Sequence, residues 1–101
     1  MRMMLTASLP NEPFNSLVRG GTVGTIIGEI LDQLKPEAAY FVEEHGTRCA
    51  VLIVDVADQS RIPFFAEPFF LKFNATCRFR IAMVADDLAR ADLDALGKKW
   101  K

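Results

Sequence analysis

Hydrophobic and polar residues alternate over two stretches of the chain, Arg2–Leu9 and Thr76–Val84. A period of two is typical of a β-strand with one face on a hydrophobic core. Two further strands are predicted over Ala38–Glu43 and Arg48–Val56, joined by a turn at His45-Gly46. The last of these is apolar from Cys49 to Val54 without alternation, which is typical of a strand covered on both faces.

Between the strands, apolar residues recur at helical spacing. The clearest helix has Thr22 as its N-cap and continues to Leu34, where Lys35-Pro36 ends it. A short helix carrying Phe14, Leu17 and Val18 is predicted before it, capped by Asn11 or Asn15 and ended by Gly20-Gly21. A third helical region extends to Phe73 and is capped by Asp58 or, preferably, Ser60. A final helix is predicted from Asp86 to Lys98-Lys99. Pro68 predicts a break or a bend near Glu67 in the helical region that extends to Phe73.

The order of these elements predicts a single α+β domain over residues 1–101. It resembles the ferredoxin-like βαββαβ arrangement with an added C-terminal helix, whose four-stranded antiparallel sheet has the strand order 4-1-3-2 and both long helices on one face. The other face would carry Met4, Thr6, Ala82 and half of the apolar third strand. One short terminal helix does not cover four strands, so we expect a symmetric homodimer in which two sheets pack face to face.

The size, the element order and the apolar open face resemble the dimeric α/β-barrel superfamily, which includes muconolactone isomerase-like, YciI-like and antibiotic-biosynthesis monooxygenase-like proteins. Glu67-Pro68-Phe69, ahead of the last strand, is similar to the Asp-Pro-Phe of YciI-like proteins. Small uncharacterised bacterial proteins of this superfamily are the nearest in overall likeness. The resemblance implies the fold and the homodimer, and it does not extend to an activity.

Composition and charge argue against several classes of function. Twelve basic and thirteen acidic side chains give a net charge of −1, so the basic surface of a nucleic-acid-binding protein is missing. No apolar run approaches the roughly 18 residues of a membrane-spanning helix, and the N-terminal residues do not form a signal peptide; we therefore expect a cytoplasmic protein. Cys49 and Cys77 are predicted to be reduced and buried, and a single histidine at a turn, His45, predicts neither a metal nor a cofactor.

The most specific candidate site is a pair of arginines on one face of the last strand. Arg78 and Arg80 are expected beside Thr6 and Ser8 of the first strand, because these two strands are antiparallel neighbours. Two guanidinium groups and two hydroxyls suit a carboxylate or a phosphate of a small ligand. Alternatively, the arginines pair with acids of a partner subunit or lie at the rim of the barrel. Arg2 is expected to pair with Asp55.

Four other residues are candidates for a pocket between the sheet and the helices. Asn15, Arg19 and Glu67 fall at predicted helix ends, and Tyr40 is the one tyrosine. A phenol in an apolar cavity can both donate and accept a hydrogen bond, so Tyr40 is the candidate for proton transfer; the alternative is a core aromatic residue. The glycines at 20, 24 and 28 have the spacing of a smooth helix face for close packing, with anion binding at the Thr22 helix start as the alternative.

Two classes of function remain open. The first is a protein that binds a small carboxylated or aromatic molecule in a barrel pocket, including a cofactor-free isomerase-like or monooxygenase-like enzyme. The second is a non-catalytic ligand-binding or regulatory dimerisation module. An RNA-recognition domain is disfavoured, because that module needs aromatic residues on its third strand, where this chain has Val51-Leu52-Ile53-Val54.

Overall fold

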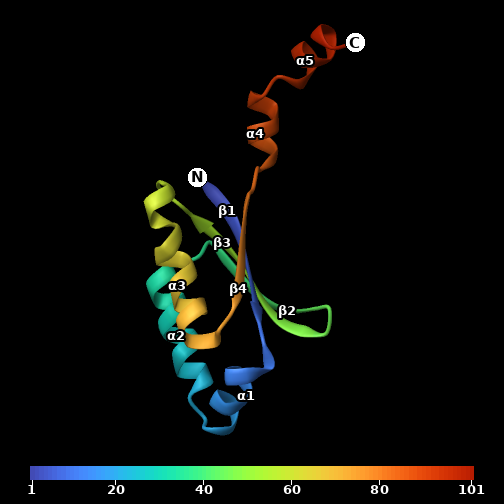
Figure 1. Ribbon diagram of the computed structural model, residues 1–101. Coiled ribbons are helices and arrows are strands. Elements are labelled where there is room, and N and C mark those ends of the chain that lie inside the picture. The colour runs from blue at the N-terminus through green and yellow to red at the C-terminus, as the bar shows by residue number, and fades with distance from the viewer.

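A four-stranded antiparallel sheet with helices on one face forms the body of the protein. The computed structural model describes all 101 residues, Met1–Lys101. The elements are β1 (Arg2–Leu9), α1 (Asn11–Arg19), α2 (Val23–Leu34), β2 (Ala38–Glu44), β3 (Thr47–Asp55), α3 (Ile62–Phe73), β4 (Thr76–Ile81), α4 (Ala85–Arg90) and α5 (Leu93–Lys99), with a short 3₁₀ turn, η1 (Gln59–Arg61), before α3. The strand order is β2-β3-β1-β4, with β1 and β3 in the centre (Figure 1). The fold is therefore α+β.

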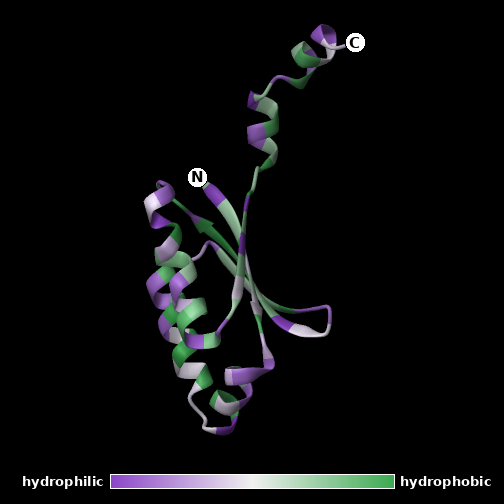
Figure 2. Ribbon diagram, in the orientation of Figure 1, coloured by the Kyte–Doolittle hydropathy of each residue, from purple (hydrophilic) through white to green (hydrophobic).

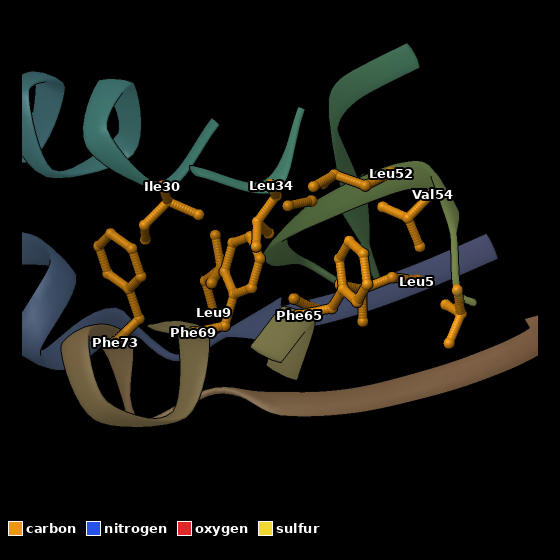
Figure 3. Close-up of a cluster of buried hydrophobic side chains, with 12 residues drawn as sticks. Leu5, Leu9, Ile30, Leu34, Leu52, Val54, Phe65, Phe69 and Phe73 are labelled. Atoms are coloured by element: carbon orange, nitrogen blue, oxygen red, sulfur yellow. The ribbon is translucent and has the colours of Figure 1, made fainter. Parts of the chain in front are cut away.

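The hydrophobic core lies between this sheet and helices α2 and α3. Leu5 and Leu9 of β1 and Leu52 and Val54 of β3 point toward the helices, as the alternation in β1 predicts. The helices contribute Ile30, Leu34, Phe65, Phe69 and Phe73 (Figure 3). All of these side chains are at least nine-tenths buried, so α2 and α3 are held to the sheet by continuous apolar contact.

Of the break or bend predicted near Glu67, the break is wrong, because α3 continues through Pro68 from Ile62 to Phe73. A proline inside a helix removes one backbone N–H donor. Phe65, Phe69 and Phe73 repeat every four residues and bury the same side of the helix on the core. The energy of that packing holds the helix together across the missing hydrogen bond.

The single C-terminal helix predicted from Asp86 is also wrong in detail. Asp92 takes a left-handed conformation, with φ of 54°, and divides the segment into α4 and α5. Each short helix has its own acidic cap: the Asp87 carboxylate accepts from the Val84 N–H at 2.9 Å, and that of Asp92 from the Ala95 N–H at 3.3 Å. β4 accordingly ends at Ile81, three residues before the predicted strand end.

Several other predicted caps and one predicted ion pair differ in the structure. Thr22 precedes α2 but its side chain makes no capping hydrogen bond. Asp58, rather than Ser60, caps the helical region after β3 by accepting from the Ser60 N–H at 2.8 Å. Arg2 pairs with Glu37 at 3.0 Å, because Asp55 is occupied by the N-terminal ammonium group at 2.8 Å.

The sheet face opposite the helices is uncovered. Figure 1 shows α2 and α3 side by side along one face and no helix over the other. The register places Met4, Thr6 and Ser8 of β1 on this open face, beside Val51 and Ile53 of β3. Tyr40 and Val42 of β2 also lie there and are strongly exposed. None of the helices has the length and hydropathy needed to cross a bilayer.

Candidate functional site

The predicted arginine pair lies on the open face of the sheet. Thr6 is the cross-strand partner of Arg78, and Met4 is the partner of Arg80. The two arginines therefore point to the same side of β4, next to β1, as the alternation predicts. Ser8 pairs with Thr76, one step further along the strands.

A concave pocket of about 460 Å³ lies over these residues, and we call it the open-face pocket. It is lined by Met4, Thr6, Glu44, Val51, Arg78, Phe79 and Arg80. Both predicted arginines and the predicted threonine line it, whereas Asn15, Arg19 and Glu67 do not. The volume is in the range of small-molecule sites.

Arg78 is neutralised by Glu44, an acid that the residue pattern along the chain does not place beside it. Its Nη2 donates to Glu44 Oε1 at 2.7 Å. This hydrogen bond lowers the pKa of Glu44 and raises that of Arg78, so the pair stays charged over the physiological range. Glu44 is at the far end of β2, and only the register of three strand pairs, β2 with β3, β3 with β1 and β1 with β4, brings it within reach of β4.

Arg80 has no carboxylate partner. Its Nη2 lies 3.1 Å from Met4 Sδ, and a thioether sulfur is a weak acceptor that carries no charge. The net positive charge of the open-face pocket therefore comes from Arg80. An exposed guanidinium without an acid suits a carboxylate or a phosphate, which it can hold with two parallel hydrogen bonds.

Thr6 is the second feature of the site that points to a ligand. Its residue is only 3 % exposed, and its Oγ1 is the one buried side-chain oxygen or nitrogen in the protein without a hydrogen-bond partner. An unpaired buried hydroxyl costs roughly 1–3 kcal/mol of stability. It belongs to a residue that lines the same pocket as Arg80, the cation without an acid.

The other candidates from the sequence lie elsewhere. Asn15 Oδ1 accepts from Arg48 Nη1 at 2.7 Å, on the helix side of the sheet. Arg19 is exposed and lies 3.7 Å from Glu12, and Glu67 is exposed on α3. These three residues therefore do not meet in one pocket.

Tyr40 is not in an apolar cavity. It is 61 % exposed on β2, and it shares a cross-strand row with Val51, Thr6 and Arg78. Three strand spacings separate it from Arg78, roughly 14 Å. The phenol thus faces the same side as the open-face pocket without reaching it.

The two cysteines are free, and each has a raised pKa. Burial raises the pKa of the Cys49 thiol, with further effect from the neighbouring Glu44. Burial also raises the pKa of Cys77 to about 11. Both thiols remain protonated at neutral pH, which is the opposite of what a nucleophilic or metal-binding cysteine requires. No cluster of three histidine, cysteine or acidic side chains is placed to hold a metal ion.

His45 and Gly46 form the two-residue turn between β2 and β3, as predicted. Both have positive φ, 54° and 78° respectively. The Gly46 N–H donates to the Glu43 carboxylate at 2.6 Å, which fixes the turn. The single histidine is thus at the tip of a hairpin.

Comparison with known proteins gives no further assignment: no family model, no curated protein and no solved structure matches this chain.

Proposed function

We propose that this protein is a homodimeric domain of the ferredoxin-like, dimeric α/β-barrel type that binds a small organic anion in the open-face pocket. The observation that carries the proposal is that one pocket is lined both by Thr6, whose buried hydroxyl has no hydrogen-bond partner, and by Arg80, whose guanidinium has no acid. The apolar part of the same pocket, Met4 and Val51, suits a compact hydrocarbon or aromatic group attached to that anion.

The homodimer is supported by the composition of the open face. Tyr40 and Val42 are exposed there, Val51 and Ile53 are half-buried, and no helix covers them. A second sheet packed on this face would remove these side chains from water and close the pocket from above.

Binding without turnover is favoured over catalysis by the electrostatics. The one carboxylate in the pocket, Glu44, has a lowered pKa because Arg78 donates to it, so it is a weak base. Tyr40, the candidate for proton transfer, is exposed on β2 and outside the pocket. A ligand-binding or regulatory module thus agrees better with the residues present than an isomerase-like or monooxygenase-like enzyme does.

Thermal unfolding in the presence of benzoate, succinate and inorganic phosphate tests the proposal. A ligand at a hundredfold excess over its Kd stabilises the native state by about 2.7 kcal/mol, which for a domain of this size raises Tm by roughly 10–20 °C. We expect a rise with at least one of the two carboxylates, and its loss in Arg80→Ala.

Arg19→Ala is the matched control, because it removes the same type of charge from an exposed position outside the pocket. It is expected to keep the full rise in Tm. Equal loss in both variants would show a non-specific charge effect and contradict the proposed site, as would the absence of any rise with all three probes.

A further inference from the structure

The last twenty residues, 82–101, leave the body of the protein, and we call them the arm. The Ala82 N–H donates to the Arg2 carbonyl oxygen at 3.1 Å, and beyond this point α4 and α5 make no extensive contact with any other element. Figure 1 shows the arm extended past one end of the sheet. The radius of gyration is 17.0 Å, where a compact domain of this length has about 13 Å.

The arm presents apolar side chains that are exposed. Leu93, Leu96 and Trp100 are spaced by three and four residues and so share one side of α5, and Leu88 is exposed on α4. Figure 2 shows hydrophobic and hydrophilic segments alternating along both helices. Helices of six and seven residues are not stable in water by themselves, so this segment requires a packing partner.

An apolar groove lies at the other end of the sheet, on the helix side, and we call it the hairpin groove. It has a volume of about 520 Å³, and its lining includes the apolar residues Leu9, Phe14, Ile27 and Phe41 and the charged residues Glu43 and Arg48. Phe41 is 50 % exposed within it. Arg48 lies over the Phe14 ring, 4.3 Å from its centroid, and forms one wall.

One acid of the hairpin groove is complementary to the basic end of the arm. The arm ends in Lys98, Lys99 and Lys101, and Glu43, which lines the groove, is in no ion pair, whereas Glu44 already pairs with Arg78. An α5 helix seated with its apolar side in the groove would place its basic end beside Glu43.

The placement of arm and groove at opposite ends of the sheet suits a two-fold dimer. β4 ends beside the start of β1, whereas the His45-Gly46 turn is at the other end of the strands, roughly 26 Å away. A two-fold axis perpendicular to the strands brings the arm end of each copy next to the groove end of the other. Both contacts then form at once, because a two-fold interface is reciprocal.

The exposed area agrees with this arrangement. The chain exposes 6931 Å², whereas a compact monomer of 11.3 kDa exposes about 5,700 Å². The excess of roughly 1,200 Å² on each copy, about 2,400 Å² for two, is in the range of obligate homodimer interfaces. We propose that each arm crosses to a second copy of the chain and packs Leu93, Leu96 and Trp100 into the hairpin groove of that copy. This inference rests on the proposed homodimer, independently of whether the two sheets pack face to face.

Trp100 provides a direct readout, because it is the one tryptophan and is 76 % exposed when the arm is free. Light scattering after size exclusion gives the oligomeric state of the full chain, and tryptophan emission over a dilution series gives the environment of the arm. We expect a dimer with blue-shifted emission, which shifts to the red as dilution separates the copies.

Two variants test the contact from each side. Leu96→Glu in the arm and Phe41→Glu in the groove are each expected to weaken the dimer at least about 30-fold, as loss of a central apolar contact does. Both side chains are exposed in the single chain, so circular dichroism should show an unchanged fold. Leu71→Glu is the control, because Leu71 is 79 % exposed on α3 and outside the groove; its dimer should persist.

Three outcomes would overturn the inference. A monomer at all concentrations with blue-shifted emission would show that the arm folds back on its own chain. A dimer with red emission would place the arm outside the interface. A dimer that persists in Leu96→Glu but is lost in Val51→Glu, on the open face, would leave the face-to-face homodimer standing without the arm contact. A dimer that is lost in Leu96→Glu but persists in Val51→Glu would support the arm contact and contradict the face-to-face packing in the proposed function.

Discussion

Thr6 and Arg80 show what single residues contribute to this site. The alternation of β1 and β4 is enough to predict that Thr6, Arg78 and Arg80 share a face, and the register confirms it. The alternation does not reveal that Glu44 reaches Arg78, because that contact depends on the pairing of β2 with β3 and of β1 with both of its neighbours. It also does not reveal that one of the arginines is left without an acid.

Replacing Thr6 by valine is expected to change protein stability and ligand binding in opposite directions. Valine has a similar shape without the hydroxyl, so Thr6→Val is expected to raise the free energy of unfolding of the ligand-free protein by about 1 kcal/mol. The same variant should lose most of the rise in Tm that the carboxylate probe produces. Chemical denaturation with and without that probe measures both effects.

Thr76→Val is the control for this experiment, because Thr76 lies on the same face of β4 and is exposed. It should change neither the free energy of unfolding nor the rise in Tm that the carboxylate probe produces. A Thr6→Val protein that is less stable than the wild type would show that the hydroxyl already has a partner in solution.

At the scale of elements, tertiary packing overrides two local preferences. α3 passes through Pro68 because its phenylalanines are buried on the core, whereas the C-terminal segment, which buries nothing, divides at Asp92 where a local cap is available. The glycines of α2 do not form a packing stripe. A Cβ at Gly24 or Gly28 would meet no atom within 4 Å, and Gly20 lies before the helix.

Gly24→Ala and Gly28→Ala are therefore expected to stabilise the protein. Glycine in an exposed helix costs about 1 kcal/mol relative to alanine, so each change should raise Tm by roughly 4–8 °C in a thermal melt.

Gly21→Ala is the contrasting variant, since Gly21 has φ of 75° and alanine would be strained there; its Tm should fall. A lower Tm for Gly24→Ala or Gly28→Ala would mean that another surface covers α2 in solution.

At the scale of the whole molecule, the body and the arm differ in what stabilises their structure. The body has a core of side chains from four elements, whereas the arm has exposed apolar residues and short helices. Regions with few buried contacts open with little free energy, and amide hydrogen exchange detects this.

We expect the amides of α4 and α5 to exchange rapidly in the Leu96→Glu monomer and slowly in the wild-type dimer. The amides of β1, in the centre of the sheet, should be protected in both proteins and serve as the internal reference. Slow exchange of the arm in the monomer would show that the arm is stable without a second copy.

The sequence by itself determined the strands, the helix α2, the turn at His45-Gly46 and the shared face of Thr6, Arg78 and Arg80, because these follow from local periodicity and turn chemistry. It could not determine how α3 tolerates Pro68, where the last strand ends, or which charges remain unpaired. Those features depend on contacts between residues far apart in the chain. Only the tertiary structure placed Glu44 against Arg78, left Thr6 Oγ1 without a partner, and carried the arm away from the body.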